Sequence, residues 1–454
     1  MNAHVVPVRL NHPAAPLPRL QMLRSLVRNP LEAWPEGIFH ERIATQRLFG
    51  RQTVTVLDPE LIRAVLVDEA DAFWKGDILA RTLGPALGQG ILTADGAHWR
   101  WQRRATAPIF RNERIVGFVP AMLEAAEATA AEWRALPPGS RIDVAEAMMR
   151  TTFDIIVATM LSGPNDIDVK AVGASITEYL EPVGWQLVLA LLNAPQWLPY
   201  PGSRKARLSR RYLRTELTRV LAERRASGED RNDLISLLFA ARDSDSGRQM
   251  TDGELADNLL TFVSAGHETT ALALTWTLYL LSQAPDVESH VRAEVEQVTG
   301  GGPLTAEALN DLVYTRQAIQ EAMRLYPPAP LIARQAVRPV RIGPVDLEKD
   351  ARVQIPIYVV HRHRALWDEP DAFDPDRFAP DAAKERHRYA YLPFGAGPRI
   401  CIGASFAMLE AAAVLATLVR QTRLTAEPGH VPYPVLRITL RPQGGMPMRV
   451  FPLS

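Results

Sequence analysis

The chain has very little cysteine, no excess of either charge and no long apolar run. Cys401 is the only cysteine in 454 residues, so an internal disulfide is excluded and a reducing compartment is expected. Lysine plus arginine and aspartate plus glutamate both number 51, which gives no support for nucleic-acid binding. No stretch approaches the roughly 18 uninterrupted apolar residues of a membrane span, so we expect no transmembrane anchor.

The rest of the composition is that of a globular protein. Hydrophobic residues make up 47% of the chain and charged residues 22%, which is enough apolar material for a large core. The 36 prolines exceed the usual share and predict many ordered turns. Length alone would suggest about three domains, although single-domain enzymes of this size exist.

The N-terminal residues 1–31 are basic and rich in proline. They carry four arginines and no acidic residue, a bias shared with mitochondrial transit peptides. The prolines from Pro7 to Pro18 disfavour a long amphipathic helix before Leu20. We therefore expect a proline-rich lead-in over residues 1–19 and a cytoplasmic protein, with a mitochondrial one as the alternative.

The segment from Phe394 to Gly403, FGAGPRICIG, surrounds Cys401 with glycine. Glycines at this density suit a backbone that turns sharply and lies close to a flat partner. The alanine-rich stretch 404–419 predicts a helix, whose N-terminus would favour a thiolate at Cys401. Such a thiolate fits a cysteine-ligated haem iron. The alternative is that Cys401 is a small buried hydrophobe, as lone cysteines often are.

Residues 251–283 predict one long helix. Thr251 and Glu254 form a capping box, and Pro285 ends the helical pattern. A helix of about 32 residues would span about 48 Å and would cross the whole molecule.

Weak helix formers occupy the middle of this helix, as AGHETT over residues 265–270. We expect a local opening there, with the Thr269 hydroxyl bonded to the Ala265 carbonyl and with Gly266 letting the backbone approach a ligand. An acid beside a hydroxyl, Glu268 and Thr269, is suited to proton delivery. The alternative for Glu268 is a carboxylate held in a salt bridge on a buried face.

Two further groups of charged and polar residues carry information. Trp99 and Arg103 are four residues apart on a predicted helix, and two donors on one face suit an anionic group. A solvated basic helix face is the alternative. Glu321 and Arg324 share a helix face, and Arg377 follows a turn-rich stretch. Taken alone, Glu321 and Arg324 would be a surface ion pair of little energetic value.

Strands are predicted at residues 52–57, 340–342, 351–357 and 436–440. Helical periodicity covers most of 117–160 and 167–225. The chain is therefore expected to be mainly α with a small β region.

These motifs together resemble the cytochrome P-450 superfamily of soluble bacterial type, over nearly the whole chain. The match to the haem-binding loop lies at Phe394, Gly395, Gly397, Arg399, Cys401 and Gly403, and the match to the oxygen-activation segment lies at Ala265, Gly266, Glu268 and Thr269. The resemblance implies one domain over residues 1–454, with a long central helix over haem and a small N-terminal-side β-sheet. No fused reductase domain is expected.

The resemblance also implies haem b as cofactor, with Cys401 as the axial ligand of the iron. The cofactor-binding residues it implies are Trp99, Arg103, Ala265, Arg334, Phe394, Arg399, Cys401 and Gly403. It makes Glu268 and Thr269 catalytic, as a proton relay. It makes Glu321, Arg324 and Arg377 a structural network that holds the loop carrying Cys401.

The activity implied is that of a haem-thiolate monooxygenase, which inserts one oxygen atom from O2 into a lipophilic small molecule. Electrons would come ultimately from NAD(P)H through a separate ferredoxin or flavodoxin-type donor. The expected docking residues for this donor are Arg100, Arg104, Arg364 and Arg399. A monomer is expected.

An apolar substrate pocket is expected beside the haem. Its predicted lining residues are Leu259, Phe262, Val263, Ala265, Ala329, Leu331, Ile332 and Ile438. Residues 73–93 and 185–197 are expected above it as a lid and a roof. Such a pocket suits a fatty acid, a terpenoid, a steroid or an aromatic compound.

Two alternatives remain from the sequence. One is a peroxide-using or peroxide-rearranging enzyme of the same fold, against which the pair Glu268 and Thr269 argues. The other is a non-catalytic haem carrier or sensor, which would need no acid and alcohol in its central helix.

Overall fold

The computed structural model describes residues 5–161, 168–231 and 233–453, and helices dominate it. The helices are α1 (Arg19–Arg28), α2 (Pro59–Arg63), α3 (Asp77–Thr82), α4 (Gly84–Leu87), α5 (Gly96–Thr106), α6 (Asn112–Ile115), α7 (Val119–Arg134), α8 (Val144–Ile156), α9 (Val169–Leu180), α10 (Val183–Leu191), α11 (Ser203–Ser227), α12 (Leu234–Ala240), α13 (Asp252–Gln283), α14 (Pro285–Thr299), α15 (Ala306–Asp311), α16 (Val313–Leu325), α17 (Ile357–Val360), α18 (Pro380–Glu385) and α19 (Ala404–Gln421). Residues 1–4 of the predicted lead-in lie outside the described residues, and so does residue 167, the first residue of the predicted helical stretch 167–225.

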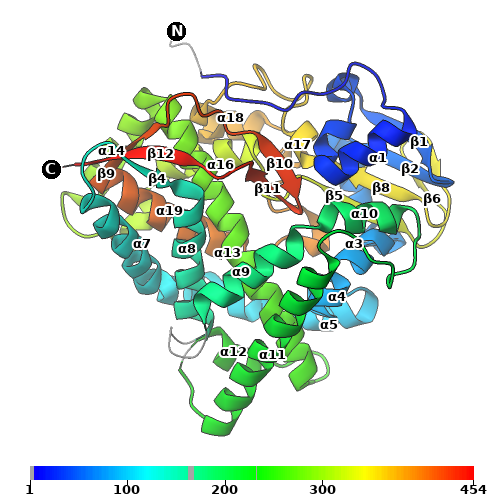
Figure 1. Ribbon diagram of the computed structural model, residues 1–454, viewed down its shortest axis with the longest axis horizontal. Helices are drawn as coiled ribbons and strands as arrows, with labels where there is room; N and C mark the ends of the chain where they lie inside the picture. Colours follow the sequence, from blue (N-terminus) through cyan, green and yellow to red (C-terminus); the bar gives the residue numbers. More distant parts are fainter. Residues whose placement is uncertain (1–4, 162–167, 232, 454) are drawn as a thin grey trace.

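The strands are short and lie in separate regions, with β1, β2, β6 and β8 at the right of Figure 1 and β4, β9 and β12 at the left. They are β1 (Ile43–Leu48), β2 (Arg51–Val56), β3 (Phe73–Trp74), β4 (Ser140–Asp143), β5 (Ile332–Ala336), β6 (Val340–Ile342), β7 (Val345–Leu347), β8 (Arg352–Ile355), β9 (Thr422–Ala426), β10 (Pro434–Arg437), β11 (Thr439–Pro442) and β12 (Pro447–Pro452). The prediction of a mainly α fold with a small β region is confirmed.

The largest sheet joins distant parts of the chain. Its order is β1-β2-β8-β5-β3, with β2 and β8 parallel and the other neighbours antiparallel. The remaining strands form the sheet β4-β12-β9 and the pairs β10-β11 and β6-β7. The N-terminal strands β1 and β2 therefore lie beside residues that precede the Cys401 loop in the sequence.

Helix α13 is the central element (Figure 1). The predicted capping box is present: the Glu254 amide donates to the Thr251 hydroxyl, and the Thr251 amide donates to the Glu254 carboxylate at 2.9 Å. The helix runs for 32 residues and packs against α8, α11, α16 and α19. Most of its residues are buried because it has neighbours on several sides. Segment 265–270 therefore lies in the middle of the molecule.

The predicted strand at residues 436–440 is wrong. The structure has two strands there, β10 and β11, which pair antiparallel with Arg437 opposite Thr439. The chain reverses at Ile438, whose φ is +77°. A β-branched residue rarely adopts this left-handed conformation, so the apolar and polar alternation indicated a continuous strand.

The loop carrying Cys401 lies directly against the backbone that follows α2. Gly397 has a φ of +70°, and a Cβ atom built on it would lie 2.0 Å from the carbonyl oxygen of Leu66. Glycine is required here for two reasons, the left-handed backbone and the close approach of another backbone.

We predict that Gly397→Ala destabilises the protein far more than Gly395→Ala. Gly395 has a similar φ of +72°, but its Cβ would meet only the Cδ1 atom of Ile332, at 3.6 Å. Both variants carry the left-handed strain of about 1 to 2 kcal/mol, whereas only Gly397→Ala must also displace the Leu66 carbonyl. Urea unfolding measures the difference, and equal losses in the two variants would contradict the close approach.

Candidate functional site

Cys401 lies at the end of a tight loop, three residues before α19 begins at Ala404. The Cys401 amide donates to the carbonyl oxygen of Phe394 at 2.9 Å, which closes the loop. Cys401 has exposed surface. The pKa of its thiol is nevertheless raised above the usual value, and the largest cause is burial by the surrounding protein. The sulfur therefore faces a space inside the molecule. A backbone hydrogen bond from Gly403 acts in the opposite direction and lowers the pKa.

The middle of α13 lies close to this loop. Phe110 separates the two: its ring centroid is 5.3 Å from that of Phe262, and its Cε1 atom is 3.9 Å from a Cβ built on Gly403. Ala265 is exposed and Thr269 is half-buried, although most of the helix is buried. This face of α13 therefore borders a space that the surrounding side chains do not fill.

The predicted bond in α13 is present, but the predicted opening is not. The Thr269 hydroxyl donates to the Ala265 carbonyl at 2.8 Å, and α13 stays α-helical throughout. Gly266 does not face the same space, because a Cβ on it would lie 2.8 Å from the Cδ1 atom of Ile156 in α8. Its lack of a side chain permits helix packing instead of the approach of a ligand.

Glu268 is buried and paired. It is 1% exposed, and its Oε1 accepts from Arg441 Nε at 2.6 Å and from the Thr439 hydroxyl. The structure therefore contains the salt bridge that the sequence left open as an alternative for this carboxylate. Glu268 does not bond to Thr269 within the described residues.

A group of cations lies near the Cys401 loop. Two of the predicted cofactor-binding residues, Arg334 and Arg399, lie close together. The pKa of Arg334 is lowered to about 10, mainly by burial and secondly by repulsion from Arg399. The Arg399 Cζ atom lies 4.3 Å from the ring centroid of Trp99. The Arg103 guanidinium lies near Cys401 and lowers the pKa of that thiol.

Sequence reasoning missed one member of this group, Lys75. Its side chain is only 9% exposed, and its Nζ donates to the carbonyls of Ile91 and Leu92. Burial, followed by repulsion from Arg399, lowers its pKa to about 7. The only signal in the sequence that could have indicated this role was the position of Lys75, a single lysine between Trp74 and Gly76 in the mostly apolar segment 73–93.

The group carries more positive charge than its own acid can balance. Asp95 pairs with Arg399 and is the carboxylate that acts on both Lys75 and Arg334. Buried cations are stable only when they are paired. A ligand with two carboxylates, next to a thiol that can bind iron, would supply the missing negative charge. Haem has both propionates and iron, so these residues fit it.

Glu321, Arg324 and Arg377, the residues of the predicted structural network, come together, and both arginines contact Glu321. The guanidinium of Arg324 donates to both carboxylate oxygens of Glu321 at 2.6 and 2.7 Å, and both side chains are fully buried. Arg377 Nε lies 3.5 Å from Glu321. Arg324 also donates to the carbonyls of three residues, His361, Pro370 and Ala372.

His361 extends this network to the Cys401 loop, which the sequence did not suggest. Its Nε2 accepts from the Leu392 amide at 2.8 Å, and the Leu392 carbonyl accepts from the Gly395 amide at 3.0 Å. Burial, and then the charge of Arg324, lower the pKa of His361 well below its usual value. A neutral ring can accept this bond, so a continuous chain of hydrogen bonds links Arg324 to the loop.

The predicted pocket residues fall into two groups. Ala329 is exposed, Ile438 is 36% exposed, and Leu331 and Ile332 are half-buried, so these four border open space. The second group, Leu259, Phe262 and Val263, is buried and borders little or no open space.

Leu259 and Val263 have no exposed surface, and Phe262 is 6% exposed. The predicted lid explains part of this burial, because the amides of Gln89 and Ile91 donate to the side chains of Asp257 and Asn258 and so hold the lid on α13. The prediction that Leu259 and Val263 line the pocket is therefore wrong. The predicted roof also faces outward at Trp197, which is 79% exposed.

The four arginines expected to dock an electron donor are all paired with carboxylates. The pairs are Arg100 with Asp71, Arg104 with Asp243, Arg364 with Asp371 and Arg399 with Asp95. They therefore do not form a free basic patch.

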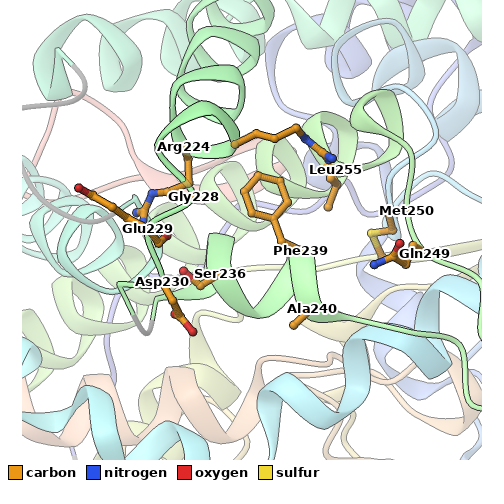
Figure 2. A pocket seen from close by; sticks show the side chains of 11 residues that line it. Arg224, Gly228, Glu229, Asp230, Ser236, Phe239, Ala240, Gln249, Met250 and Leu255 are labelled. Atoms are coloured by element: carbon orange, nitrogen blue, oxygen red, sulfur yellow. Dashed lines mark hydrogen bonds between the residues drawn. The ribbon is translucent and has the colours of Figure 1, made fainter.

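A separate cavity of about 400 Å³ lies at the junction of α11, α12 and α13 (Figure 2). Arg225, Phe239 and Leu255 are among its lining residues. Leu255 is ten residues before Ala265, which is about 15 Å along a helix. None of the predicted site residues lines this cavity, so it is distinct from the space at Cys401.

Among the described residues, only α19 is long and apolar enough to cross a membrane by length and composition. The share of α19 that is buried inside the protein is 67%, as is usual for a helix of a protein core.

We predict that Lys75→Met speeds the loss of haem. The variant removes a buried cation from the group that would pair with the propionates, and a charge-assisted hydrogen bond of this kind makes a difference of roughly 10-fold. Lys205→Met is the control, because Lys205 is a surface lysine that pairs with Glu178. Transfer of haem to apomyoglobin gives the rates, and equal rates for wild type and Lys75→Met would exclude Lys75 from the haem site.

Comparison with known proteins identifies the family. The Cytochrome P450 family profile matches residues 39–446. Cyclooctatin synthase of Streptomyces melanosporofaciens is 35% identical over 97% of this chain and 95% of its own. Cyclooctat-9-en-7-ol 5-monooxygenase of the same organism is 32% identical over 91% and 89%. Pentalenene oxygenase of Streptomyces avermitilis is 31% identical over 91% of both chains.

The crystal structure of the cytochrome P450DA heme domain superposes with a TM-score of 0.85, at 25% identity, over 99% of this chain and 98% of that one. The overall fold thus agrees with that of a known haem domain over nearly the whole chain. The resemblance predicted from the Cys401 loop and the AGHETT segment is confirmed. This chain is a haem-binding oxidoreductase of the cytochrome P450 family.

Proposed function

We propose that the protein inserts one oxygen atom from O2 into a lipophilic small molecule, with electrons from a separate donor protein. One observation carries the proposal. The Cys401 thiol faces an internal space between a group of buried cations and the exposed Ala265 face of α13. That arrangement suits a haem bound by cysteine on one side and open to substrate on the other.

The roles of the residues follow from their positions. Cys401 would bind the iron as thiolate, and the Gly403 backbone would stabilise that charge. Trp99, Arg103, Arg334, Arg399 and Lys75 would hold the propionates. Bound haem supplies the activation of O2 and the cleavage of its O–O bond.

Proton delivery is proposed for Thr269 and Glu268. The Thr269 hydroxyl borders the internal space and is held by the Ala265 carbonyl. It can pass a proton to an oxygen atom in that space when a neighbouring acid supplies one. Glu268 adjoins Thr269 in the chain, and because Arg441 and Thr439 both bind its Oε1, a bond that leads to Thr269 would use its Oε2.

The substrate is proposed to be apolar. Ala329, Leu331, Ile332 and Ile438 border the space and offer hydrocarbon surface. The names of two relatives denote an unsaturated hydrocarbon and an unsaturated alcohol as substrates. Among fatty acids, terpenoids, steroids and aromatic compounds, these names favour a terpenoid.

The electron donor is proposed to be a ferredoxin or a flavodoxin, reduced in turn by NAD(P)H. Ile400, next to Cys401, is 38% exposed, and Val67 beside Gly397 is 36% exposed. We infer that the donor contacts this apolar surface close to the sulfur. The paired arginines would steer it less strongly than free ones. A cytoplasmic monomer is proposed.

A peroxide-driven reaction is the second candidate. It is favoured by the ion pair of Glu268 with Arg441, because a reaction that starts from peroxide does not need this carboxylate to deliver a proton.

We predict a red-shifted haem-thiolate absorption band in the reduced, carbon-monoxide-bound protein, by resemblance to the family. By the same resemblance, we expect terpenoid alcohols and hydrocarbons to shift the ferric spin state. A panel that also contains fatty acids and steroids checks the substrate class. Absence of the band would contradict the proposed function itself, whereas shifts with fatty acids alone would contradict only the substrate class.

We predict that Thr269→Ala lowers the product formed per NAD(P)H oxidised by roughly 10-fold or more, because one donor of the relay is lost. Thr270→Val is the matched control, since the Thr270 hydroxyl bonds the Gly266 carbonyl and is buried. Hydrogen peroxide as sole oxidant tests the second candidate. Unchanged coupling in Thr269→Ala, with full peroxide-driven turnover, would favour that candidate over the relay.

A further inference from the structure

The turn at Ile438 is the most strained point near the proposed substrate space. β10 and β11 pair up to Arg437 and Thr439, so the chain reverses at one residue. That residue is a β-branched isoleucine with a φ of +77°. A conformation of this kind persists only where the surroundings hold it.

Two side chains of β11 hold the turn to α13. Thr439 and Arg441 are two residues apart, so they lie on the same face of the strand. Both donate to Oε1 of Glu268, Arg441 through Nε at 2.6 Å and Thr439 through its hydroxyl. Glu268 is 1% exposed and Thr439 is 6% exposed, so their bond is shielded from water, whereas the Arg441 side chain is 21% exposed and its bond is partly shielded. A shielded, charge-assisted bond is stronger than one at the surface.

The rest of the hairpin is anchored elsewhere. The Leu440 carbonyl accepts from Trp276 Nε1 at 3.0 Å, and the Leu440 amide donates to the Pro328 carbonyl at 3.0 Å. On the other strand, the Leu436 amide donates to Asn29 at 3.1 Å. These bonds fix the body of the hairpin. The segment at Ile438 is held on one side by Arg437, which donates to the Arg28 carbonyl at 2.7 Å, and on the other side by the bonds that Thr439 and Arg441 make with Glu268.

Ile438 lies exposed at the tip of this packed hairpin, next to Thr439, which contacts α13 through Glu268. It is 36% exposed, whereas Leu436 and Leu440 are 7% and 0% exposed. Glu268 lies three residues after the exposed Ala265, on the same side of the helix. Because Thr439 contacts Glu268, the adjacent Ile438 lies close to the face of α13 that carries Ala265.

We propose that Glu268 is a positioning residue for substrate binding. Its carboxylate fixes Thr439 and Arg441, and through them it holds Ile438 in the strained conformation that shapes the distal space. The proposal rests on the proposed function, because Ile438 can act on a substrate only if that space receives one. It adds a second role to the carboxylate that was assigned to the relay.

The two roles are linked. While Arg441 and Thr439 occupy Oε1 of Glu268, a bond toward Thr269 must come from Oε2, on a carboxylate whose orientation these two partners fix. A bulky ligand that displaces Ile438 would weaken the bonds of Thr439 and Arg441 and release the acid. Substrate occupancy would in this way favour proton delivery.

The experiment compares Glu268→Gln, Arg441→Gln and the double variant in the haem-loaded full chain. 4-Phenylimidazole is the bulky probe, and imidazole is the small probe that reaches the iron without filling the distal space. We expect each single variant to lower the affinity for 4-phenylimidazole by roughly 3- to 10-fold and to leave the affinity for imidazole unchanged. The double variant should bind 4-phenylimidazole no more weakly than the weaker-binding of the two single variants. Arg441→Lys, which keeps the charge, should restore part of the affinity.

Hydrogen exchange of residues 434–442, measured without any probe, provides a readout that is independent of ligand binding. Exchange in Glu268→Gln and Arg441→Gln should be several-fold faster than in wild type. Arg437→Gln is the matched control, because this arginine of the same hairpin donates to the carbonyls of Arg28 and Leu436 and not to Glu268.

The results separate the possible failures. The positioning role would be overturned if Arg441→Gln kept both the hydrogen-exchange rates and the 4-phenylimidazole affinity of wild type. This holds whatever effect Glu268→Gln has on the product formed per NAD(P)H oxidised. Additive losses in the double variant would also overturn it, because the two residues would then act independently. If wild type binds neither imidazole, the proposed function fails, while the exchange data still decide whether Glu268 holds the turn.

Discussion

The buried ion pair between Glu321 and Arg324 is the interaction on which the haem-facing part of the protein depends. Both side chains have no exposed surface, and the guanidinium also donates to three backbone carbonyls of the irregular chain between α17 and α18. Breaking a buried pair leaves a charge without a partner and costs about 3 to 5 kcal/mol. From Arg324, hydrogen bonds lead through His361 and Leu392 to Gly395. A loop without regular structure can thus hold a sulfur atom in place.

The opposite electrostatic situation exists on the other side of the loop. Lys75, Arg334 and Arg399 are gathered around the carboxylate of Asp95. Burial is the main cause that lowers the pKa of each of these cations, and repulsion from Arg399 is the second cause for Lys75 and Arg334. The protein alone does not balance these charges, whereas the two propionates of haem would. Binding of the cofactor and stability of this region are therefore coupled, as for any ligand that binds only the folded state.

Glu268 illustrates how one side chain can serve two requirements. A relay needs an acid that can reach the distal oxygen, and the turn at Ile438 needs a fixed partner for Thr439 and Arg441. The structure contains the second arrangement. Both roles depend on the orientation of one carboxylate, so an occupant of the distal space that moves the turn would act on both.

The sequence by itself determined the family and the central helix, and it predicts Cys401 as the iron ligand. Cys401 among glycines, the capping box at Thr251 and the Glu268–Thr269 pair are local patterns, and local patterns are visible in a sequence. Tertiary structure alone decided which partners these residues meet. Lys75 joins the cations, Gly266 faces Ile156 and Glu268 binds Arg441 because segments far apart in the chain pack together. The turn at Ile438 was hidden for the same reason: its backbone conformation is imposed by long-range contacts against the preference of isoleucine itself.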